Sequence, residues 1–380
     1  MLIALDLSAA FDTIDHDRLA ERLRSEFGIV DNALQLIQSY LSGRTQCIAI
    51  GGDISATHNC TTGIPQGSVL GPFLFSIYIS PIADVIESFD VAQHQYADDA
   101  NMYCALEFKY DTITTDRIEA CTNAVQQWCV ANGMQLNPAK SEVLLVATHG
   151  QSLKFTGSNG LSVAGARLDF ASSVRSLGVL LDTRLSFNEH VTKLCQACNY
   201  HIRSLKHIRP MLTDSVALSV AGSIVNLRLD YCNALLYGTS ERNISKLQRV
   251  QNAVARAVDC RPRRAHMRPI LDKLYWLPIR ERLHYKMALL AYQGRVGLLP
   301  RYLSTLLSDY KPARTLRSGF GAPLLQTRRV RNELARRSFG VAVPAVWNAL
   351  PPALRLAPSL DTFKAGLKSN LFREAFHDLL

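Results

Sequence analysis

Hydrophobic and polar positions alternate with short periods over the first part of the chain. Residues 2–7 (LIALDL) form a brief apolar run, which predicts a buried strand that ends at Asp6. The next segment, HDRLAERLRSEFG, places Leu19, Leu23 and Phe27 at helical spacing and finishes with a glycine, so it predicts an amphipathic helix. The sequence TQCIAIGG that follows predicts a strand ended by a turn.

The mixture of strand and helix patterns continues up to about residue 187. Pro65, Gly67 and Ser68 mark a loop and a helix start before the apolar run VLGPFLFSIYI. The segment DTITTDRIEACTNAVQQWCVANG predicts a helix, which leads through the turn LNPAKSE into the strand VLLVAT. After a Gly- and Ser-rich passage at 150–165, the strand SLGVLLD closes this part. Strands interspersed with helices in this way indicate an α+β or α/β sheet layer.

From about residue 188 the strand patterns become rare. The segment LPIRERLHYKMALLAYQG and the segment ERNISKLQRVQNAVARAV both have helical periodicity, and the second carries one apolar face made of Ile244, Leu247, Val250, Val254 and Val258. Beyond residue 300, basic clusters such as RRVRNELARR mix with Pro-rich turns. We therefore expect three parts: a sheet-containing domain at 1–187, a helical region at 188–300 and a basic tail region at 301–380.

The composition restricts the class of protein. Of 380 residues, 48% are hydrophobic and 19% are charged, which is typical of a globular chain with a sizeable core. The apolar stretches are too short or too interrupted to span a bilayer, and the N-terminus lacks the features of a signal peptide. Nine cysteines at irregular spacings argue against a secreted disulfide framework. We expect an intracellular protein of the nucleus and cytoplasm that makes no membrane contact.

The net charge of +10 hides an asymmetry between the two halves. Residues 1–190 contain 11 Lys and Arg against 21 Asp and Glu, a balance of −10, whereas residues 191–380 contain 31 against 11, a balance of +20. A basic half of this size indicates a polyanionic partner, most simply nucleic acid, although solvated helix faces would give the same count.

Two adjacent carboxylates stand in the neutral run HQYADDANMY. Asp98 and Asp99 repel each other, and no Lys or Arg occurs anywhere from residue 45 to residue 108. One interpretation is a plain hairpin turn, because Asp is a preferred turn residue. If the hairpin lies beside the first strand, however, Asp6 joins the pair and the cluster needs a cation. Ligands that are all oxygen suit two Mg²⁺ or Mn²⁺ ions, the arrangement used in phosphoryl transfer.

A zinc site at Cys195, Cys198 and His201 is a weaker interpretation. A fourth ligand is missing, and the spacing of three residues fits a plain helix. We therefore expect no zinc.

Five blocks of sequence share an order with a known family. LDLSAAFDTIDH, GIPQGSVLGPFLFSIYI, YADD, LNPAKSE and LGVLLD follow the order and approximate spacing of the reverse transcriptase palm. The chain resembles the polymerase of non-LTR (LINE-type) retrotransposons, particularly jockey-like elements, and the blocks LDYCNALLYG, KLQRVQNA, LYWLPIRERLHYK and VWNALPPALR extend the resemblance. It implies an α+β palm with an antiparallel sheet, followed by a mostly helical thumb-like and C-terminal region.

The resemblance implies a role for each catalytic residue. Asp6 and Asp98 match the carboxylates that bridge two Mg²⁺ ions, and Asp99 matches the third and least direct ligand. These ligands align the primer 3′-hydroxyl on the α-phosphate of the incoming nucleotide. Lys140 matches a lysine that approaches the pyrophosphate leaving group and helps to expel it, although a lone loop lysine can also be merely solvated.

The resemblance also implies the substrate contacts. Phe11 stands where the family places an aromatic ring against the sugar 2′ position, which would select deoxynucleotides; a core aromatic at a helix start is the alternative. Gln66 and Gly67 match a nucleotide-contacting loop, for which a capping turn is the alternative. Leu177 and Gly178 match the primer grip, where a plain buried strand is equally compatible.

Taken together, these matches predict an RNA-directed DNA polymerase that uses an RNA template, a DNA primer and dNTPs; the oligomeric state stays open. A catalytically inert nucleic-acid-binding remnant is the alternative, and a group II intron-type or retron polymerase is a third reading that the C-terminal blocks do not favour. Only five residues precede Asp6, whereas family members have a fingers region there, and many carry an endonuclease upstream. We therefore expect a 5′-truncated copy or a partial gene model.

Overall fold

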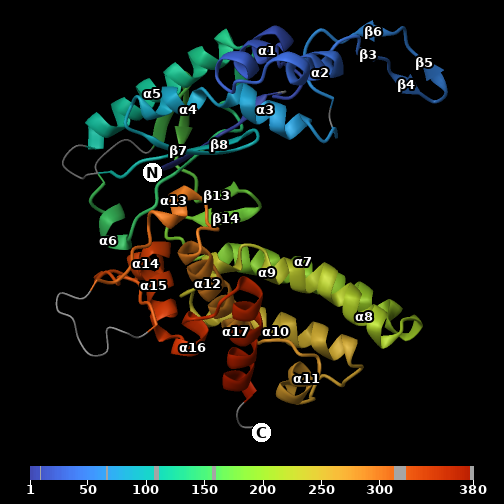
Figure 1. The fold of residues 1–380 in the computed structure, drawn as a ribbon, viewed down its shortest axis with the longest axis vertical. Coiled ribbons are helices and arrows are strands. Elements are labelled where there is room, and N and C mark those ends of the chain that lie inside the picture. Colours follow the sequence, from blue (N-terminus) through green and yellow to red (C-terminus); the bar gives the residue numbers. More distant parts are fainter. Residues whose placement is uncertain (9, 66, 107–110, 156–159, 312–321, 377–380) are drawn as a thin grey trace. The chain divides into compact units, whose positions relative to one another are not determined.

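The computed structural model describes residues 1–8, 10–65, 67–106, 111–155, 160–311 and 322–376. The chain divides into two compact units, Met1–Arg184 and Leu185–Leu380, which are described separately below (Figure 1).

The first unit is built around a four-stranded antiparallel sheet in the order β10-β1-β8-β7. Its strands are β1 (Leu2–Leu5), β7 (Ala92–Tyr96), β8 (Asp99–Tyr103) and β10 (Glu142–Leu144). Alternate residues of the central strands face the core: Ile3, Met102 and Val143 are fully buried. The apolar run at the N-terminus is thus the buried strand that the sequence predicts.

Helices cover one side of this sheet, and Figure 1 shows α4 and α5 running beside β7 and β8. The helices of the first unit are α1 (His16–Ser25), α2 (Asp31–Leu41), α3 (Gly71–Ile79), α4 (Ile82–Glu87), α5 (Asp111–Ala131) and the short α6 (His149–Ser152). Because α3 and α4 lie deep in the unit, their side chains pack with the strands into one continuous hydrophobic core. The long helix expected before Gly133 is confirmed as α5.

Helix α1 begins where Asp15 accepts a hydrogen bond from the Arg18 backbone N–H, an N-cap interaction. Leu19 and Leu23 are fully buried, as their spacing predicts. The third expected core residue is wrong, because Phe27 is 46% exposed. The helix has already ended at Ser25, so the chain no longer follows the helical period that would turn Phe27 inward.

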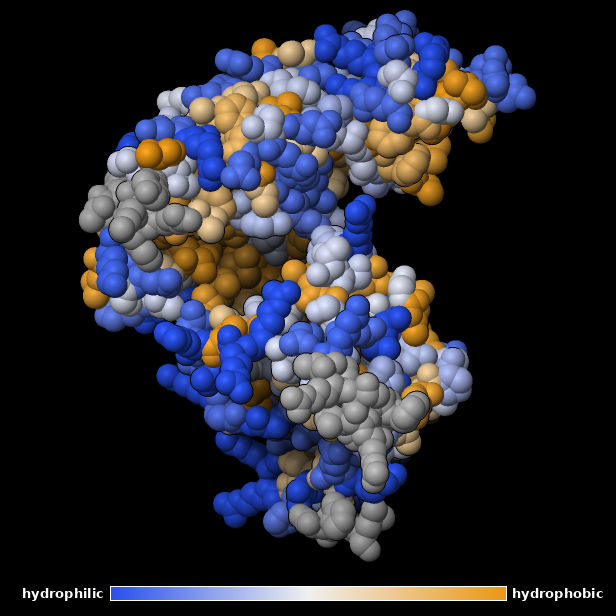
Figure 2. Space-filling view, turned by 60° about the vertical axis from the view of Figure 1, so that its left-hand side comes forward, coloured by the Kyte–Doolittle hydropathy of each residue, from blue (hydrophilic) through white to orange (hydrophobic). Residues whose placement is uncertain are grey.

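The small strands of the first unit form hairpins and bridges outside the main sheet. They are β2 (Leu7–Ser8) with β9 (Gln135–Leu136), β3 (Thr45–Gln46) with β6 (His58–Asn59), β4 (Ala49–Ile50) with β5 (Asp53–Ile54), β11 (Gly160–Val163) with β12 (Ala166–Asp169), and β13 (Ser173–Ser176) with β14 (Val179–Asp182). The strand expected in TQCIAIGG is a ribbon with Ile48, Ile50 and Ile54 at least 67% exposed. Figure 2 shows hydrophobic residues at the surface of this part of the first unit.

The strand expected in SLGVLLD is confirmed over Val179–Asp182, but it begins three residues later than the sequence block. It is the second half of a hairpin, because the turn between β13 and β14 falls on Leu177 and Gly178. Both turn residues have positive φ, 45° and 80°, as a two-residue type I′ hairpin turn requires.

In the described residues, every named element of the second unit is helical, in agreement with the loss of strand patterns after residue 188. The α-helices are α7 (Asn188–Ile208), α8 (Asp214–Ala221), α9 (Leu227–Asp230), α10 (Glu241–Val258), α11 (Met267–Lys273), α12 (Ile279–Arg295), α13 (Arg301–Ser304), α14 (Glu333–Arg337), α15 (Phe339–Ala349), α16 (Pro352–Arg355) and α17 (Leu360–Phe376). Shorter turns are the 3₁₀ segments Arg209–Met211 and Asn233–Leu236 and the π-helical segment Gly222–Asn226. No described helix is both long enough and apolar enough to traverse a bilayer.

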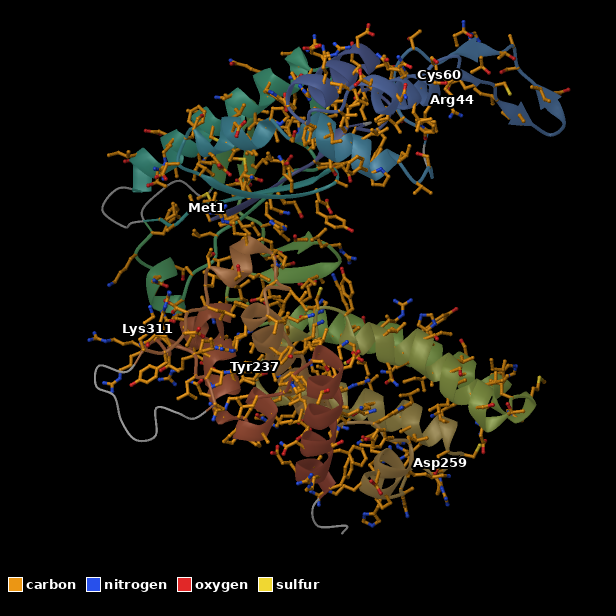
Figure 3. All side chains as sticks on the ribbon, viewed as in Figure 1. Met1, Arg44, Cys60, Tyr237, Asp259 and Lys311 are labelled. Atoms are coloured by element: carbon orange, nitrogen blue, oxygen red, sulfur yellow. The ribbon has the colours of Figure 1, made fainter. Side chains whose placement is uncertain are left out.

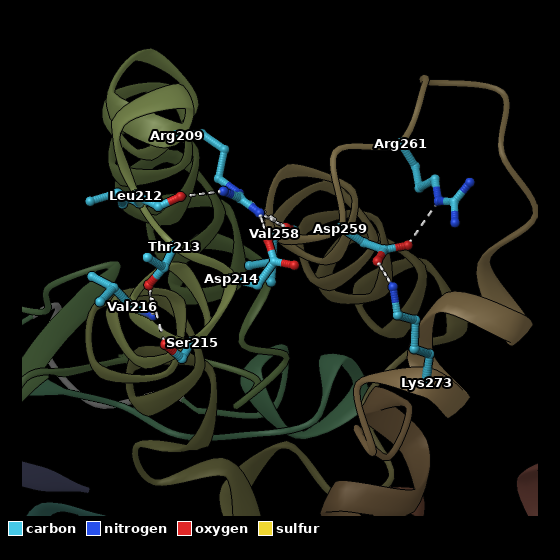
Figure 4. Close-up of polar contacts among 10 residues, drawn as sticks. All are labelled: Arg209, Leu212, Thr213, Asp214, Ser215, Val216, Val258, Asp259, Arg261 and Lys273. Atoms are coloured by element: carbon cyan, nitrogen blue, oxygen red, sulfur yellow. Dashed lines mark hydrogen bonds and ion pairs between the residues drawn. The ribbon is translucent and has the colours of Figure 1, made fainter.

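On the predicted apolar face of α10, Leu247, Val250, Val254 and Val258 are all at most 3% exposed, whereas Ile244 is only partly buried. Polar contacts fasten the end of this helix to its neighbours (Figure 4). Arg209 Nε donates to the Val258 carbonyl at 3.0 Å. Beyond the helix, burial alone would raise the pKa of Asp259, but hydrogen bonds and ion pairs with Lys273 and Arg261 more than offset it, so its pKa is lowered.

A second core lies among α12, α15 and α17. Its centre is Trp347, fully buried, with the Phe363 ring 6.0 Å away between centroids. Buried residues on both sides of residue 300 belong to this one core, from Leu277 to Leu371. Residues 188–300 and 301–380, which we expected to be separate regions, therefore share one hydrophobic core.

Candidate active site

Strand pairing brings the three candidate carboxylates to one end of the central strands. Strand β1 pairs antiparallel with β8, and the last pair is Leu5 with Ala100. Continuing that register by one position places Asp6 opposite Asp99. On the other side of β8, Tyr96 pairs with Asp99, so Ala97 and Asp98 form the two-residue loop of the β7–β8 hairpin. Asp6, Asp98 and Asp99 come from sequence positions about ninety residues apart and meet through this register.

The hairpin expected at the two aspartates is confirmed, and its turn is strained. Ala97 has φ = 53°, in the left-handed region that is costly for a residue with a Cβ atom. Asp98 and Asp99 are exposed at the tip. The pairing of both flanking strands holds the backbone in this conformation, so the tip presents its carboxylates in a fixed place.

The electrostatics of the tip are those of uncompensated negative charge. Burial and then the charges of Asp98 and Asp6 raise the pKa of Asp99 above its ordinary value. Within the described residues, none of the three carboxylates forms an ion pair with a Lys or Arg. The like charges are therefore close enough to repel each other, with no basic side chain to neutralise them.

A turn on the opposite side of β1 fixes the backbone of Asp6. The Asp6 N–H donates to Ser141 Oγ at 3.2 Å, and the Asp6 carbonyl accepts from the Asn137 N–H at 2.8 Å. Ser141 Oγ in turn donates to the Asn137 carbonyl at 2.8 Å. The sequence showed Ser141 only as the residue after Lys140, and its role in holding Asp6 could not be recognised without the fold.

Lys140 lies in this same turn. Strand β10 pairs with β1 so that Glu142 is opposite Ala4, and continuing the register places Lys140 beside Asp6. The Lys140 side chain is exposed, and it forms no ion pair with a described residue. The fold therefore brings Lys140 to the same strand end as the carboxylates, while a contact with a leaving group stays a prediction.

Phe11 is half-buried and stacks on Phe75, with ring centroids 4.7 Å apart. Its carbonyl accepts from the Ile64 N–H at 2.9 Å. Phe11 therefore makes the core contact of the alternative interpretation. Part of its ring remains exposed, and a contact of this part with the sugar of a nucleotide stays a prediction.

The loop before Pro65 packs tightly on the segment after Phe11. The Gly63 N–H donates to the Ile14 carbonyl at 2.8 Å, and His16 Nε2 donates to the Gly63 carbonyl at 2.7 Å. A Cβ atom at Gly63 would lie 2.8 Å from the Asp12 carbonyl oxygen, and φ is +85°, so only glycine fits. Gln66 lies outside the described residues, and Gly67 follows with φ = 80°.

A cavity of about 520 Å³ opens beside this loop. It is lined by Asp12, His16, Arg44, Thr45, Gln46, Asn59, Cys60, Thr61, Thr62, Gly63, Ile64 and Pro65. Figure 3 labels Arg44 and Cys60, which both come from the base of the exposed ribbon. Sequence reasoning missed His16 and Arg44, because nothing in their local spacing connects them with the Gly63 loop.

Among the described residues, no group of three His, Cys, Asp or Glu side chains is arranged to hold a metal ion. Leu177 and Gly178, expected at the primer grip, lie in the β13–β14 turn, and their contact with a primer stays a prediction.

Comparison with known proteins matches residues 1–179 to the family described as reverse transcriptase (RNA-dependent DNA polymerase). The RNA-directed DNA polymerase from mobile element jockey of Drosophila melanogaster is 27% identical over 269 residues, which cover 68% of this chain and 28% of that protein. The probable RNA-directed DNA polymerase from transposon X-element of the same species is 27% identical over 261 residues, with 67% and 28% covered. The chain thus spans about 28% of the length of these relatives.

Among solved structures, a telomerase from Candida albicans in complex with a fragment of telomeric RNA aligns with a TM-score of 0.34 and 11% identity, over 75% of this chain and 48% of that chain. The family match over 1–179 covers every block from LDLSAAFDTIDH to YADD and LNPAKSE, and the relatives are polymerases of jockey and related mobile elements. Residues 1–179 thus match the reverse transcriptase family, and the chain is similar to the RNA-directed DNA polymerases of jockey-like mobile elements.

Proposed function

We propose that this domain is an RNA-directed DNA polymerase that adds deoxynucleotides to a primer 3′-hydroxyl. The observation that supports the proposal is the meeting of Asp6, Asp98 and Asp99 at the end of β1 and β8 in a domain of reverse transcriptase sequence. An RNA template, a DNA primer and dNTPs are the substrates proposed from the relatives.

The chemistry of the donor set fits divalent cations. The three side chains offer only carboxylate oxygens, which Mg²⁺ and Mn²⁺ prefer. Burial raises the pKa of Asp99, and the charges of Asp98 and Asp6 raise it further; a cation would relieve this repulsion.

Asp6 and Asp98 would hold two ions between them, with Asp99 as the less direct ligand. Two bound ions supply charge stabilisation for the attacking and leaving oxygens of the phosphoryl transfer. The task of the protein is positioning: Asn137 and Ser141 hold the backbone of Asp6, and the paired strands hold the hairpin. Lys140, beside Asp6 in register, would donate a proton to the departing pyrophosphate or stabilise its negative charge.

The remaining residues would select and hold the substrates. Phe11 would exclude a 2′-hydroxyl by the edge of its ring, since its stacking on Phe75 fixes where the ring can lie. Gln66 and Gly67 would contact the incoming nucleotide and template. Leu177 and Gly178 would contact the primer from the tip of a tight turn.

Primer extension tests the proposal. The assay is incorporation of dNTPs on an RNA template with an annealed DNA primer in Mg²⁺. Because the chain spans about 28% of its relatives, it is assayed both alone and with a fingers region of a family polymerase fused ahead of Met1. We expect extension that is lost in Asp98→Asn and retained in Asp53→Asn, an exposed aspartate on the outer ribbon. Extension that survives Asp98→Asn would reject the assignment.

The alternative function is nucleic-acid binding without catalysis. The balance of +20 in residues 191–380 favours it, because charge alone gives sequence-independent binding. A folded chain that binds the template–primer in both forms of the assay, yet extends it in neither, would support this alternative.

A further inference from the structure

The second unit carries an exposed basic segment on a rigid base. Short backbone pairing joins the chain after α13 to the chain before α14: the Tyr310 N–H donates to the Leu324 carbonyl at 3.0 Å, and the Gln326 N–H donates to the Ser308 carbonyl at 2.8 Å. Between these bonds, Asp309 and Leu325 form an antiparallel bridge. The two segments therefore form a small fixed ribbon.

Side chains of the second core fasten this ribbon from below. Asn348 accepts from the Leu325 N–H at 2.9 Å and donates to its carbonyl at 2.8 Å. Trp347 Nε1 donates to the Pro323 carbonyl at 2.9 Å, and Arg355 donates to the Ala322 carbonyl at 2.8 Å. With Leu325 itself buried, the backbone that leads into the basic segment cannot swing freely.

The arginines that follow this base are left without ion-pair partners. Arg328, Arg329 and Arg331 are exposed, and within the described part of the chain none of them pairs with an acidic side chain. Glu333, two residues after Arg331, forms no ion pair with a described residue, and Asp309 on the ribbon is already paired with Arg295. Three exposed cations within four residues, with no acidic partner in the described part of the chain, have the charge pattern of an anion-binding surface.

An aromatic ring and a further cation lie at the other end of the ribbon. Tyr310 is 47% exposed and is followed by the exposed Lys311, which Figure 3 labels. Tyr310 lies opposite Leu324, four residues before Arg328, so the chain between Leu324 and Arg328 spans at most about 13 Å. Cations that follow a phosphate backbone, together with an exposed ring on which a base can stack, are the features of single-strand binding surfaces.

We propose that Tyr310, Lys311, Arg328, Arg329 and Arg331, here called the Arg328 surface, bind single-stranded nucleic acid, with the cations on phosphates and the Tyr310 ring stacked on a base. This surface belongs to the second unit and does not depend on the carboxylates of the first. Single strands fit better than a membrane, because the arginine segment from Gln326 to Asn332 carries no large exposed apolar side chain that could enter lipid.

Binding of the full chain to a fluorescent 20-nucleotide oligo(U), measured in EDTA over a range of salt concentrations, tests the proposal independently of polymerase activity. The variant is Arg328→Gln/Arg329→Gln/Arg331→Gln, and the matched control is Arg242→Gln/Arg263→Gln/Arg264→Gln, which removes three exposed arginines elsewhere in the second unit. Three lost phosphate contacts should reduce the log–log salt slope by about 2 and lower the affinity about a hundredfold at 0.1 M salt. The control should leave the slope close to that of the wild type.

Stacking has its own test. Tyr310→Ala should weaken oligo(U) binding by about fivefold to a hundredfold, and Tyr310→Phe should restore it, because phenylalanine stacks but lacks the hydroxyl. An equal loss in the control triple variant would overturn the proposal, since the charge would then act diffusely. Wild-type-like binding by Tyr310→Ala, or a triple variant that loses binding to phosphatidylserine vesicles but not to oligo(U), would overturn it as well.

Discussion

Replacing Asp98 with asparagine should stabilise the metal-free protein, although it removes a proposed ligand. Asp98 is adjacent to Asp99 in the sequence. The Cα atom of Asp6 lies about 5 Å from that of Asp99 across the paired strands. Two such charges interact by roughly 1–3 kcal/mol at an effective dielectric constant between bulk water and the protein surface. Because Asp98 and Asp99 are exposed, solvent screening reduces this to about 0.5–1 kcal/mol. The asparagine variant should therefore melt about 1–4 °C higher in EDTA.

Mg²⁺ should reverse the order of the two melting temperatures. A ligand that binds only the native state adds RT ln(1 + [L]/Kd), about 1.4 kcal/mol at tenfold excess over Kd. The wild type, with all three carboxylates, should gain this stabilisation in Mg²⁺. Its melting temperature should then exceed that of Asp98→Asn, which keeps only two of the three carboxylates. Thermal unfolding followed by circular dichroism, with EDTA and with a titration of Mg²⁺, measures both melting temperatures.

Asp53→Asn provides the control, because Asp53 is exposed on the outer ribbon and forms no ion pair with a described residue. Asp53→Asn should have the same melting temperature as the wild type, both in EDTA and in Mg²⁺. If Asp98→Asn is no more stable than the wild type in EDTA, the three carboxylates do not repel each other as the register implies. If Mg²⁺ leaves the wild-type melting temperature unchanged, the cluster is not a cation site.

Three further substitutions test a tight turn in the first unit and buried ionisable groups in the second. Gly63→Ala should destabilise the first unit by about 2 kcal/mol or more in urea unfolding, because the new Cβ atom meets the Asp12 carbonyl oxygen at positive φ; an unaffected midpoint would contradict this. Arg282→Ala should cost about 2–3 kcal/mol, because it leaves Asp230, held at 2.9 Å and raised in pKa by burial, without its partner, whereas replacing both residues with apolar ones should cost less. Burial lowers the pKa of His284, so the unfolded chain takes up its proton first and stability should fall as the pH drops below 6.5; His284→Leu should flatten that slope in melts between pH 5 and pH 7.

The sequence by itself determined the features that depend on local pattern and on residue identity. The period of apolar positions placed α5 and α10, because a helix repeats over three to four residues and its buried face can be read from neighbours along the chain. The order of the motif blocks predicted the reverse transcriptase family that residues 1–179 match. The pair at Asp98 and Asp99 indicated a hairpin that carries two carboxylates, because Asp both favours turns and carries a negative charge.

The tertiary structure decided which distant residues meet. Asp6 faces Asp99, and Ser141 holds the Asp6 backbone, through pairing between strands that are far apart in sequence. No local period encodes such a register, because it results from the packing of all the strands and helices of the unit at once. The same reason explains why Phe27 is exposed and why the backbone at Leu325, which leads into the Arg328 surface, is held in place: a helix end and hydrogen bonds from distant side chains, rather than the local sequence, decide both.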